Sequence, residues 1–478
     1  MISHGDPYIR TRIKWGLALL PALGVAALAG IYSVGHPKQA LALGALAALA
    51  LVLLDLNGRT ESLLKRFRWL PFAWVALLLV TDLRFDYADP RAVAAGAVSL
   101  QHVVELLTYA TVGALALRAR GTIVSLYPRP VPKGLLLAWP LVAVVSALWT
   151  VVHPLYTFVR AGQLLVIATL ALLLVRIWLS DRATGEELFA RTLRLFVQVV
   201  TILALIGLAV GAEEGAGRFT WPGVHTGMAG TYLGAAFVIL VLGGRSWTRF
   251  PAHTYWPRVF LFGATVILSE TRNVLAGIVL AVAIALWLKG REKPITRYLG
   301  ILYYVVGALV LISLAATQLG TYLSRGETVG SLESLSGRIP LWEFAIGRLE
   351  SIQEWAVGFG YGASRAILLD DFHWAGSAHS TWVELLLGVG LVGAVLAATS
   401  MILVGFWLVK RRSFGRANLV ATSLLAYFVM TSFLSEVLVL PGLGFTFLAL
   451  VHIPALAQRG MRRDMARGTA QGEEAHAR

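Results

Sequence analysis

Fourteen apolar runs, each close to the length of a membrane span, dominate this chain of 478 residues. Hydrophobic residues make up 57% of it and charged residues only 14%, whereas soluble domains carry about a quarter charged residues. A helix needs about 20 apolar residues to cross the hydrocarbon core. The runs lie at residues 15–34, 39–55, 69–83, 92–117, 134–152, 157–177, 193–211, 226–243, 256–270, 273–288, 298–316, 381–409, 417–435 and 437–457. Three of these are short enough to be re-entrant, so we predict an all-α polytopic membrane protein with 12–14 transmembrane helices.

The N-terminus and the absence of cysteine restrict the chain further. The first apolar run follows a polar, basic segment and has no small-residue cleavage site before a soluble domain, so we interpret it as a retained span. The chain has no cysteine. This excludes disulfides, a thiol nucleophile and cysteine-bound metals.

The distribution of basic residues predicts the orientation in the membrane. One set of loops holds ten of the 41 Lys and Arg residues, and the opposite set holds the other 31. The ten are Lys38, Arg84, Arg91, Arg160, Arg218, Arg272, Arg325, Arg338, Arg348 and Arg365. Because basic residues are enriched in cytoplasmic loops, both termini are predicted to be cytoplasmic. The same bias accounts for the net charge of +15 without a nucleic-acid partner.

This map divides the chain into four parts. Residues 1–316 form an N-terminal transmembrane bundle, 317–380 a large outward-facing loop, 381–457 the C-terminal transmembrane helices, and 458–478 a polar cytoplasmic tail predicted to be disordered. Inside the loop, Pro340 to Trp355 has the pattern of one amphipathic helix. Its apolar face comprises Leu341, Phe344, Ala345, Leu349 and Ile352. The glycines at 358, 360 and 362 end it.

Four arginines on the predicted outer side are candidate anion-binding residues: Arg160, Arg218, Arg272 and Arg338. An arginine at membrane depth is costly unless it is paired or faces water, and its planar fork binds phosphate oxygens in a bidentate manner. These residues therefore suit a pyrophosphate at the lipid surface. Each arginine also has an alternative role. Arg160 and Arg218 could anchor the helix ends to lipid headgroups, and Glu270 could neutralise Arg272. Arg338 could be a solvated loop residue.

His379 is the candidate general base. It stands at the end of the loop, at a membrane–water boundary, and histidine exchanges a proton near neutral pH. Ser380 and Thr381 have N-cap chemistry for the following span, and Gly390 and Gly393 would let another helix approach closely. The alternative for His379 is a local capping or hydrogen-bonding role.

Other ionisable residues favour structural roles. His102 and Glu105 lie three residues apart in one span and so can pair on one helix face, and His452 has the setting of a core histidine. Asp370, Asp371 and His373 have the chemistry of metal ligands. Adjacent aspartates on a loop are usually solvated, however, so we predict no metal site.

The run of His379-Ser380, nine residues and then Gly390-Leu-Val-Gly393 resembles the signature of bacterial O-antigen ligases. These belong to a superfamily shared with O-antigen polymerases and protein O-oligosaccharyltransferases. The Ser336-Gly-Arg338 element, Leu341-Trp342 and the Thr271-Arg272 pair also look like that superfamily, as does the single large loop before the last helices. The resemblance covers roughly residues 200–410.

The resemblance implies a GT-C-like glycosyltransferase architecture at the inner membrane, with its site on the periplasmic face. Such ligases transfer O-polysaccharide from undecaprenyl pyrophosphate to a sugar hydroxyl of lipid A–core with inversion, and use neither metal nor nucleotide cofactor. His379 matches the family's essential histidine, and Arg272 and Arg338 match its essential arginines, with Arg218, Arg160 and His225 as further pyrophosphate contacts. His225 stands where many relatives have Asn.

Three other functions remain open from the sequence. An O-antigen polymerase or a protein O-oligosaccharyltransferase would use the same donor with a different acceptor, and only the histidine motif separates them from a ligase. A secondary transporter or flippase would also have many spans with embedded charges, but it predicts inverted repeats and broken helices, and the sequence has no repeat strong enough to support it. Oligomeric state is not predicted.

Overall fold

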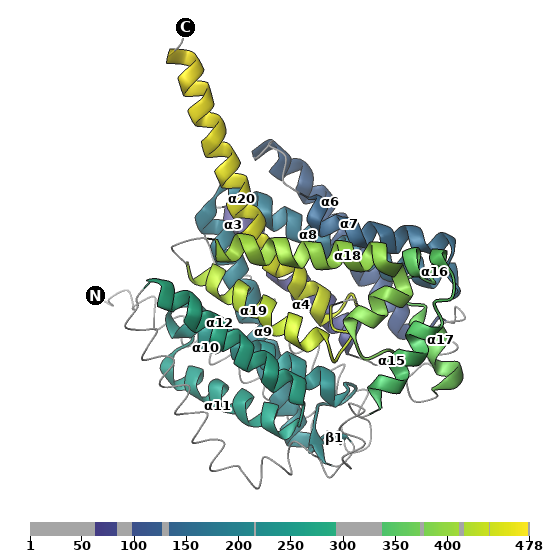
Figure 1. Ribbon diagram of the computed structural model, residues 1–478. Helices are drawn as coiled ribbons and strands as arrows, with labels where there is room; N and C mark the ends of the chain where they lie inside the picture. Colours follow the sequence, from purple (N-terminus) through teal and green to yellow (C-terminus); the bar gives the residue numbers. More distant parts are fainter. Residues whose placement is uncertain are drawn as a thin grey trace.

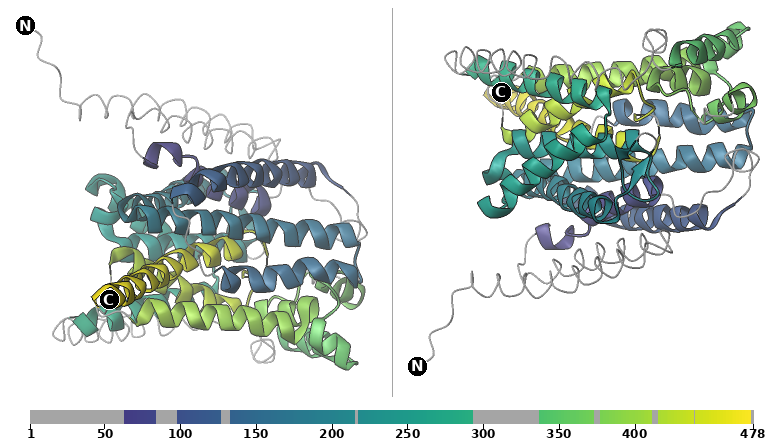
Figure 2. Two further views of the ribbon diagram at one scale, coloured as in Figure 1. Left: turned by 90° about the horizontal axis from the view of Figure 1, so that it is seen from above. Right: turned by 90° about the horizontal axis from the view of Figure 1, so that it is seen from below.

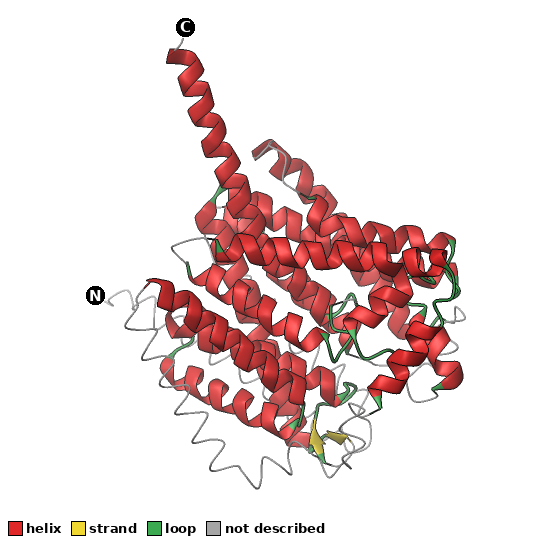
Figure 3. Cartoon of the chain, viewed as in Figure 1, coloured by secondary structure: helices red, strands yellow, loops and turns green. Residues whose placement is uncertain are grey.

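The computed structural model describes residues 63–83, 98–126, 133–214, 217–292, 337–372, 377–410, 415–438 and 440–476. Within these ranges the chain is a bundle of long helices, with one two-stranded hairpin (Figure 1; Figure 3). The helices of the first half are α3 (Leu63–Arg66), α4 (Leu70–Asp82), α6 (Leu100–Leu126), α7 (Gly134–Val145), the 3-10 turn η2 (Ser146–Leu148), α8 (Pro154–Ser180) and α9 (Arg182–Val210). After the strands β1 (Glu213–Glu214) and β2 (Arg218–Phe219) come α10 (Thr226–Thr248), α11 (Ala252–Leu268) and α12 (Arg272–Glu292). The last elements are α15 (Arg338–Gly347), α16 (Ile352–Val357), α17 (Ser364–Asp371), α18 (Thr381–Val409), α19 (Arg416–Ser432) and α20 (Leu443–His476).

The prediction of an all-α polytopic membrane protein is confirmed. Among the described residues, six helices are long and apolar enough to cross a membrane; they begin at Leu100, Pro154, Arg182, Thr226, Arg272 and Thr381. Eleven of the fourteen predicted runs fall at least partly in the described residues, and a helix covers each of them. The runs at 15–34, 39–55 and 298–316 lie outside the described residues, so the total of 12–14 spans stays a prediction.

The helices lie side by side around one continuous apolar core (Figure 2). α12 packs on α19, α8 on α20, and α10 on both α9 and α19. Aromatic rings fill the centre, where Phe196 contacts Tyr232 and Phe447. Large apolar side chains on the outer faces of α6, α11 and α18, such as Leu107, Phe260 and Ile402, are exposed, as expected for helices surrounded by lipid.

Local sequence signals explain several helix ends. Asp181 accepts hydrogen bonds from the backbone N–H groups of Ala183 and Thr184 and so caps α9, which ends at Gly211 in the left-handed conformation. Pro154 starts α8, where its missing N–H costs nothing. Asp82, at the end of α4, accepts from the backbone N–H of Leu443 and from the hydroxyl of Tyr232, so it fixes the start of α20 inside the core.

The helix expected over residues 340–355 is instead two helices. α15 ends at Gly347, and α16 begins after Ser351, whose hydroxyl accepts from the N–H of Glu354 while the Glu354 carboxylate accepts from the N–H of Ser351. This capping box restarts the helix in a new direction. Leu341, Ala345 and Leu349 are buried, whereas Ile352 is 90% exposed and belongs to the second helix, so these residues do not form one face of a single helix.

The glycine-rich segment after α16 joins both halves of the bundle. Phe359 and Gly360 donate backbone hydrogen bonds to Leu387 and Gly388 of α18, and Val151 donates to Phe359 from the other side. At Gly390, φ is +62° and α18 bends; a Cβ there would lie 2.3 Å from the carbonyl oxygen of Ala356. Gly390 therefore permits the close helix approach that we predicted, with α16 as the partner. At Gly393 the nearest atoms belong to Val389 of the same helix.

The C-terminus also differs from the prediction. α20 continues to His476, where the sequence favours a disordered tail from residue 458. The first residue of that tail, Gln458, is buried and donates a hydrogen bond to Asn418 of α19. Tertiary packing therefore carries the helix past the apolar run, and its end extends beyond the bundle (Figure 1).

Candidate active site

His379 lies in a strained turn just before α18. Its φ is +50°, in the left-handed region that few residues other than glycine adopt. The hydroxyl of Ser377 accepts from the backbone N–H of His379 at 3.4 Å and lies 3.5 Å from its Nδ1. Strain of this kind costs about 1–3 kcal/mol and concentrates at functional sites. The surrounding contacts therefore hold His379 in one conformation.

A carboxylate faces the imidazole. Oε2 of Glu436 lies 3.6 Å from Nδ1 of His379, and the two side chains are 22% and 31% exposed, so a substrate can reach them. Burial raises the pKa of Glu436, but the hydrogen bond and charge of His379, and a hydrogen bond from Ser377, lower it to about 2. Glu436 is therefore an anion at neutral pH. A carboxylate beside Nδ1 favours the tautomer with the lone pair on Nε2.

The loop between α19 and α20 brings Glu436 to this position. The carbonyl oxygen of Ser435 accepts hydrogen bonds from both the N–H and the hydroxyl of Thr381. The same hydroxyl accepts from the N–H of Leu438. Thr381 therefore ties the start of α18 to the loop rather than capping its own helix, and the Ser380 side chain makes no capping bond either. Our expectation that Ser380 and Thr381 cap α18 was wrong.

Arg338 is the first residue of α15 and follows Gly337, whose φ is +81°. The indole N–H of Trp342 on the same helix donates to the carbonyl oxygen of Ala378 at 2.7 Å. Leu341, Ala345 and Ala378 belong to one small apolar cluster under the loop. α15 and the turn that carries His379 are therefore packed together.

Arg272 begins α12, immediately after the short turn that follows α11. α10 packs tightly against that turn, because a Cβ at Gly230 would lie 2.6 Å from the hydroxyl of Thr271. One and a half turns further along α12, Gly277 packs against Tyr427 and Thr431 near the end of α19. Since the residues directly after α19 hold the start of α18, Arg272 and His379 lie at the same end of the bundle.

Arg218 and His225 are at this end as well. Arg218 starts β2, which pairs with β1 next to α11, and the hairpin lies at the same end as α15 (Figure 1). His225 is the N-cap residue of α10, where its Nδ1 accepts from the N–H of Gly227 at 3.1 Å. Its ring is exposed. The structure therefore gives His225 a capping contact.

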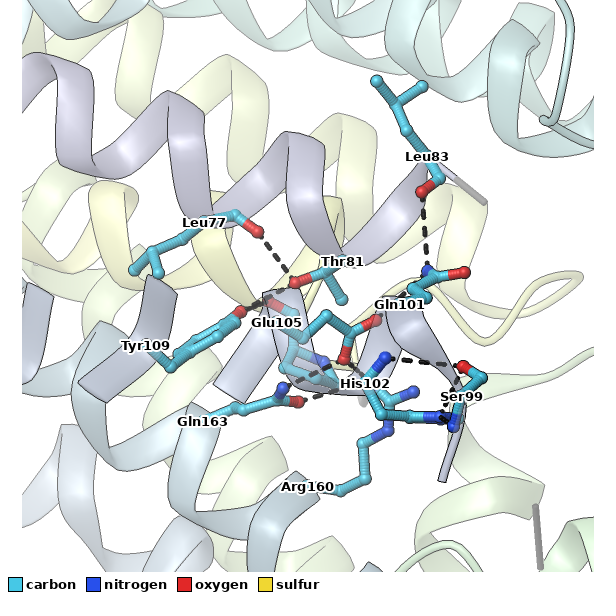
Figure 4. A network of polar contacts seen from close by, with 11 residues as sticks. Leu77, Thr81, Leu83, Ser99, Gln101, His102, Glu105, Tyr109, Arg160 and Gln163 are labelled. Carbon is cyan, nitrogen blue, oxygen red and sulfur yellow. Dashed lines mark hydrogen bonds and ion pairs between the residues drawn. The ribbon is translucent and has the colours of Figure 1, made fainter. Parts of the chain in front are cut away.

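Arg160 has a carboxylate partner (Figure 4). Its Nη1 lies 2.8 Å from Oε2 of Glu105. The Glu105 carboxylate also accepts hydrogen bonds from Gln101 at Oε1 and from Gln163 at Oε2. The carboxylate side chain is 3% exposed and the guanidinium side chain 17%. The geometry thus gives Arg160 a structural ion pair between α6 and α8. His102, on the same helix as Glu105, accepts at Nδ1 from the backbone N–H of Ser99.

Two further sequence interpretations can be placed. His452 is buried between Ser400 and the carbonyl oxygen of Leu448, so it is a core histidine as predicted. Asp371 is exposed and forms an ion pair with Arg348 at 3.0 Å. The side chain of Asp370 and all of His373 lie outside the described part of the structure, so the trio is not described as a group.

Sequence analysis missed two carboxylates at the site. Glu436 stands in a short connection between two apolar runs and has no spacing relation to His379, so only the fold brings the two together. Glu384 had a signal: it is an ionisable residue in the first turn of a long span, which is unusual. It is buried, and its Oε1 accepts the backbone N–H of Ala378 at 2.6 Å.

Comparison with known protein families gives one match. Residues 258–398 match the family model described as O-antigen ligase. The match includes Arg272, Arg338, His379 and the glycines at 390 and 393, whereas Glu436 lies beyond it. No curated protein and no solved structure matches the chain at a significant level, so the GT-C-like comparison stays a prediction. Residues 258–398 are therefore similar to the O-antigen ligase family, whose activity is of glycosyltransferase type, and the surrounding helices are those of a multi-pass membrane protein.

Proposed function

We propose that the protein is an O-antigen ligase of the bacterial inner membrane. It transfers O-polysaccharide from undecaprenyl pyrophosphate to a sugar hydroxyl of lipid A–core on the periplasmic face, with both termini in the cytoplasm. The observation that carries the proposal is the pair of His379 and Glu436, 3.6 Å apart, at the same bundle end as Arg272 and Arg338. The imidazole and its carboxylate suit the deprotonation of a hydroxyl acceptor, and the nearby arginines suit the binding of an anionic donor.

His379 acts as the general base. The acceptor hydroxyl oxygen attacks the anomeric carbon of the donor sugar, and its proton passes to Nε2 of His379. Glu436 orients the ring from Nδ1 and stabilises the imidazolium that forms. Base catalysis of this kind contributes about 10²- to 10⁴-fold in rate. The imidazolium afterwards releases the proton to water.

The arginines hold the leaving group. As the bond between the anomeric carbon and the pyrophosphate oxygen breaks, negative charge grows on that oxygen, and fixed guanidinium groups stabilise it. Arg272 and Arg338 have this role, with Arg218 and His225 as further contacts. Arg160 contributes less, because Glu105 already neutralises it. Attack opposite to the leaving group inverts the anomeric centre, and the arginines supply the positive charge that a divalent ion would otherwise supply.

The histidine variant tests this function in cells. His379→Ala should reach the membrane in normal amount but leave lipid A–core without O-polysaccharide, while undecaprenyl-linked polymer of normal chain length accumulates. His253→Ala, an exposed histidine on α11, is the matched control and should give normal smooth lipopolysaccharide. Smooth lipopolysaccharide from the His379 variant would contradict the proposal. Lipid A–core bearing a single repeat would identify a polymerase instead.

A further inference from the structure

The residue before His379 is held on both sides by other helices. The N–H of Ala378 donates to Oε1 of Glu384 on α18 at 2.6 Å, and its carbonyl oxygen accepts from the indole N–H of Trp342 on α15 at 2.7 Å. Ala378 itself is fully buried. Both of its backbone polar groups are thus fixed by side chains from two different elements.

Helix capping does not account for the contacts of Glu384. In the first turn of a helix, an acidic side chain normally accepts from the free N–H groups of that same turn or of the N-cap. Glu384 instead accepts from the N–H of Ala378, three residues before α18 begins, and from the side chain of Ser364 on α17. A buried carboxylate in a span is costly, and here it fixes the peptide that leads into the strained His379.

The second contact links this peptide to the helix of Arg338. Trp342 is one turn after Arg338 on α15, so the position of α15 and the position of the Ala378 carbonyl depend on each other. His379 follows directly, at φ +50°. The peptide directly before His379 is therefore held by two hydrogen bonds that neither His379 nor Glu436 makes.

We propose that Trp342 and Glu384 are positioning residues that fix Ala378 and thereby hold the His379 imidazole against Glu436. This inference rests on the proposed role of His379 as the base. The two side chains do not touch the reacting atoms. They keep the base in one place. Because Trp342 belongs to α15, they also fix the position of the base relative to the helix that carries Arg338.

Four variants of the full-length protein in nanodiscs separate this role from general packing. Trp342→Phe keeps the ring but removes the donor, and Glu384→Met removes the acceptor. Glu384→Gln keeps an acceptor oxygen at the same position, and Trp355→Phe is the control, since Trp355 lies on α16 and is partly exposed. Small misplacements of a catalytic group cost on the order of 10²-fold in rate, so kcat should fall by about 10- to 100-fold in the first two variants. KM for the lipid-linked donor should be unchanged, and Glu384→Gln and Trp355→Phe should resemble the wild type.

An NMR signal of the ring gives a second readout that packing alone would not move. With histidines labelled at Cε1, the His379 resonance is assigned by its loss in His379→Ala. It should shift or broaden in Trp342→Phe and Glu384→Met and stay in place in the other two variants. Wild-type kcat and an unmoved resonance in both Trp342→Phe and Glu384→Met, with His379→Ala inactive, would overturn the positioning role and leave the proposed function intact. Wild-type transfer by His379→Ala would instead overturn the proposed function, and this inference with it.

Discussion

Replacing Glu436 by glutamine removes the charge that faces Nδ1 of His379 while keeping the shape of the side chain. The pKa of Glu436 stands at about 2, against 4.5 for an ordinary glutamate. At about 1.4 kcal/mol per pH unit, the difference corresponds to about 3 kcal/mol of stabilisation of the charged form. Glu436→Gln should therefore lower the melting temperature at pH 7.

The pH dependence of that loss has a definite sign. Because the pKa of Glu436 is depressed in the folded protein, its contribution is complete above pH 4.5 and disappears as the pH falls toward 2. The melting temperatures of wild type and Glu436→Gln should accordingly differ above pH 4.5 and converge as the pH falls from 4.5 toward 2. Glu350→Gln, an exposed carboxylate in the same half of the chain, is the matched control and should melt as the wild type does at every pH.

Activity should fall more than stability. The amide of glutamine donates a hydrogen bond to Nδ1, which places the imidazole proton on Nε2 and removes the lone pair that the acceptor needs. Stabilising the wrong tautomer in this way costs on the order of 10⁴-fold where it has been measured in a catalytic triad. The assay is transfer of glycan from a defined undecaprenyl-linked donor to lipid A–core. Wild-type transfer together with an unchanged melting temperature would refute the role given to Glu436.

Three further predictions follow from particular contacts. Gly390→Ala should destabilise the protein by about 1–3 kcal/mol, because φ is +62° and the new Cβ would lie 2.3 Å from the Ala356 carbonyl oxygen. The control Gly405→Ala, where the atom nearest to the new Cβ is at 3.4 Å, should leave the melting temperature unchanged. Equal melting temperatures of the two variants would contradict the close packing of α16 on α18. Glu105→Gln should cost about 3–5 kcal/mol by removing the carboxylate of a buried ion pair, measured as a lower melting temperature, and a wild-type value would show that the pair carries little energy. Purified enzyme should keep its transfer rate in EDTA, because arginines supply the positive charge; loss in EDTA and recovery with magnesium would favour a metal site at Asp370 and Asp371.

The helices were the most predictable part of the structure. Long apolar runs bounded by basic or turn residues have few alternatives to a transmembrane helix, and the runs that fall in the described residues are helical. The break between α15 and α16 was missed although the Ser351-x-x-Glu354 capping pattern is present in the sequence. The apolar spacing of residues 341–352 outweighed it, and one helix was predicted where the structure has two.

The candidate site was only half visible in the sequence. His379, Arg272 and Arg338 are recognisable from motifs, and His379 and Arg272 also stand at the boundaries of apolar runs. Glu436 is 57 positions from His379 in the sequence and meets it only because the end of α19 packs beside the start of α18. Contacts of this kind depend on the arrangement of helices, which periodicity does not encode. The pairing of Arg160 with Glu105 was missed for the same reason.

A reconstituted transfer reaction tests the central claim most directly. Purified protein is given a defined undecaprenyl pyrophosphate-linked glycan and lipid A–core, and both the glycosylated product and the released undecaprenyl pyrophosphate are measured. The account predicts transfer by the wild type, none by His379→Ala although that variant still binds the donor, and weakened donor binding in Arg272→Ala and Arg338→Ala. Product formation by His379→Ala at the wild-type rate would contradict it.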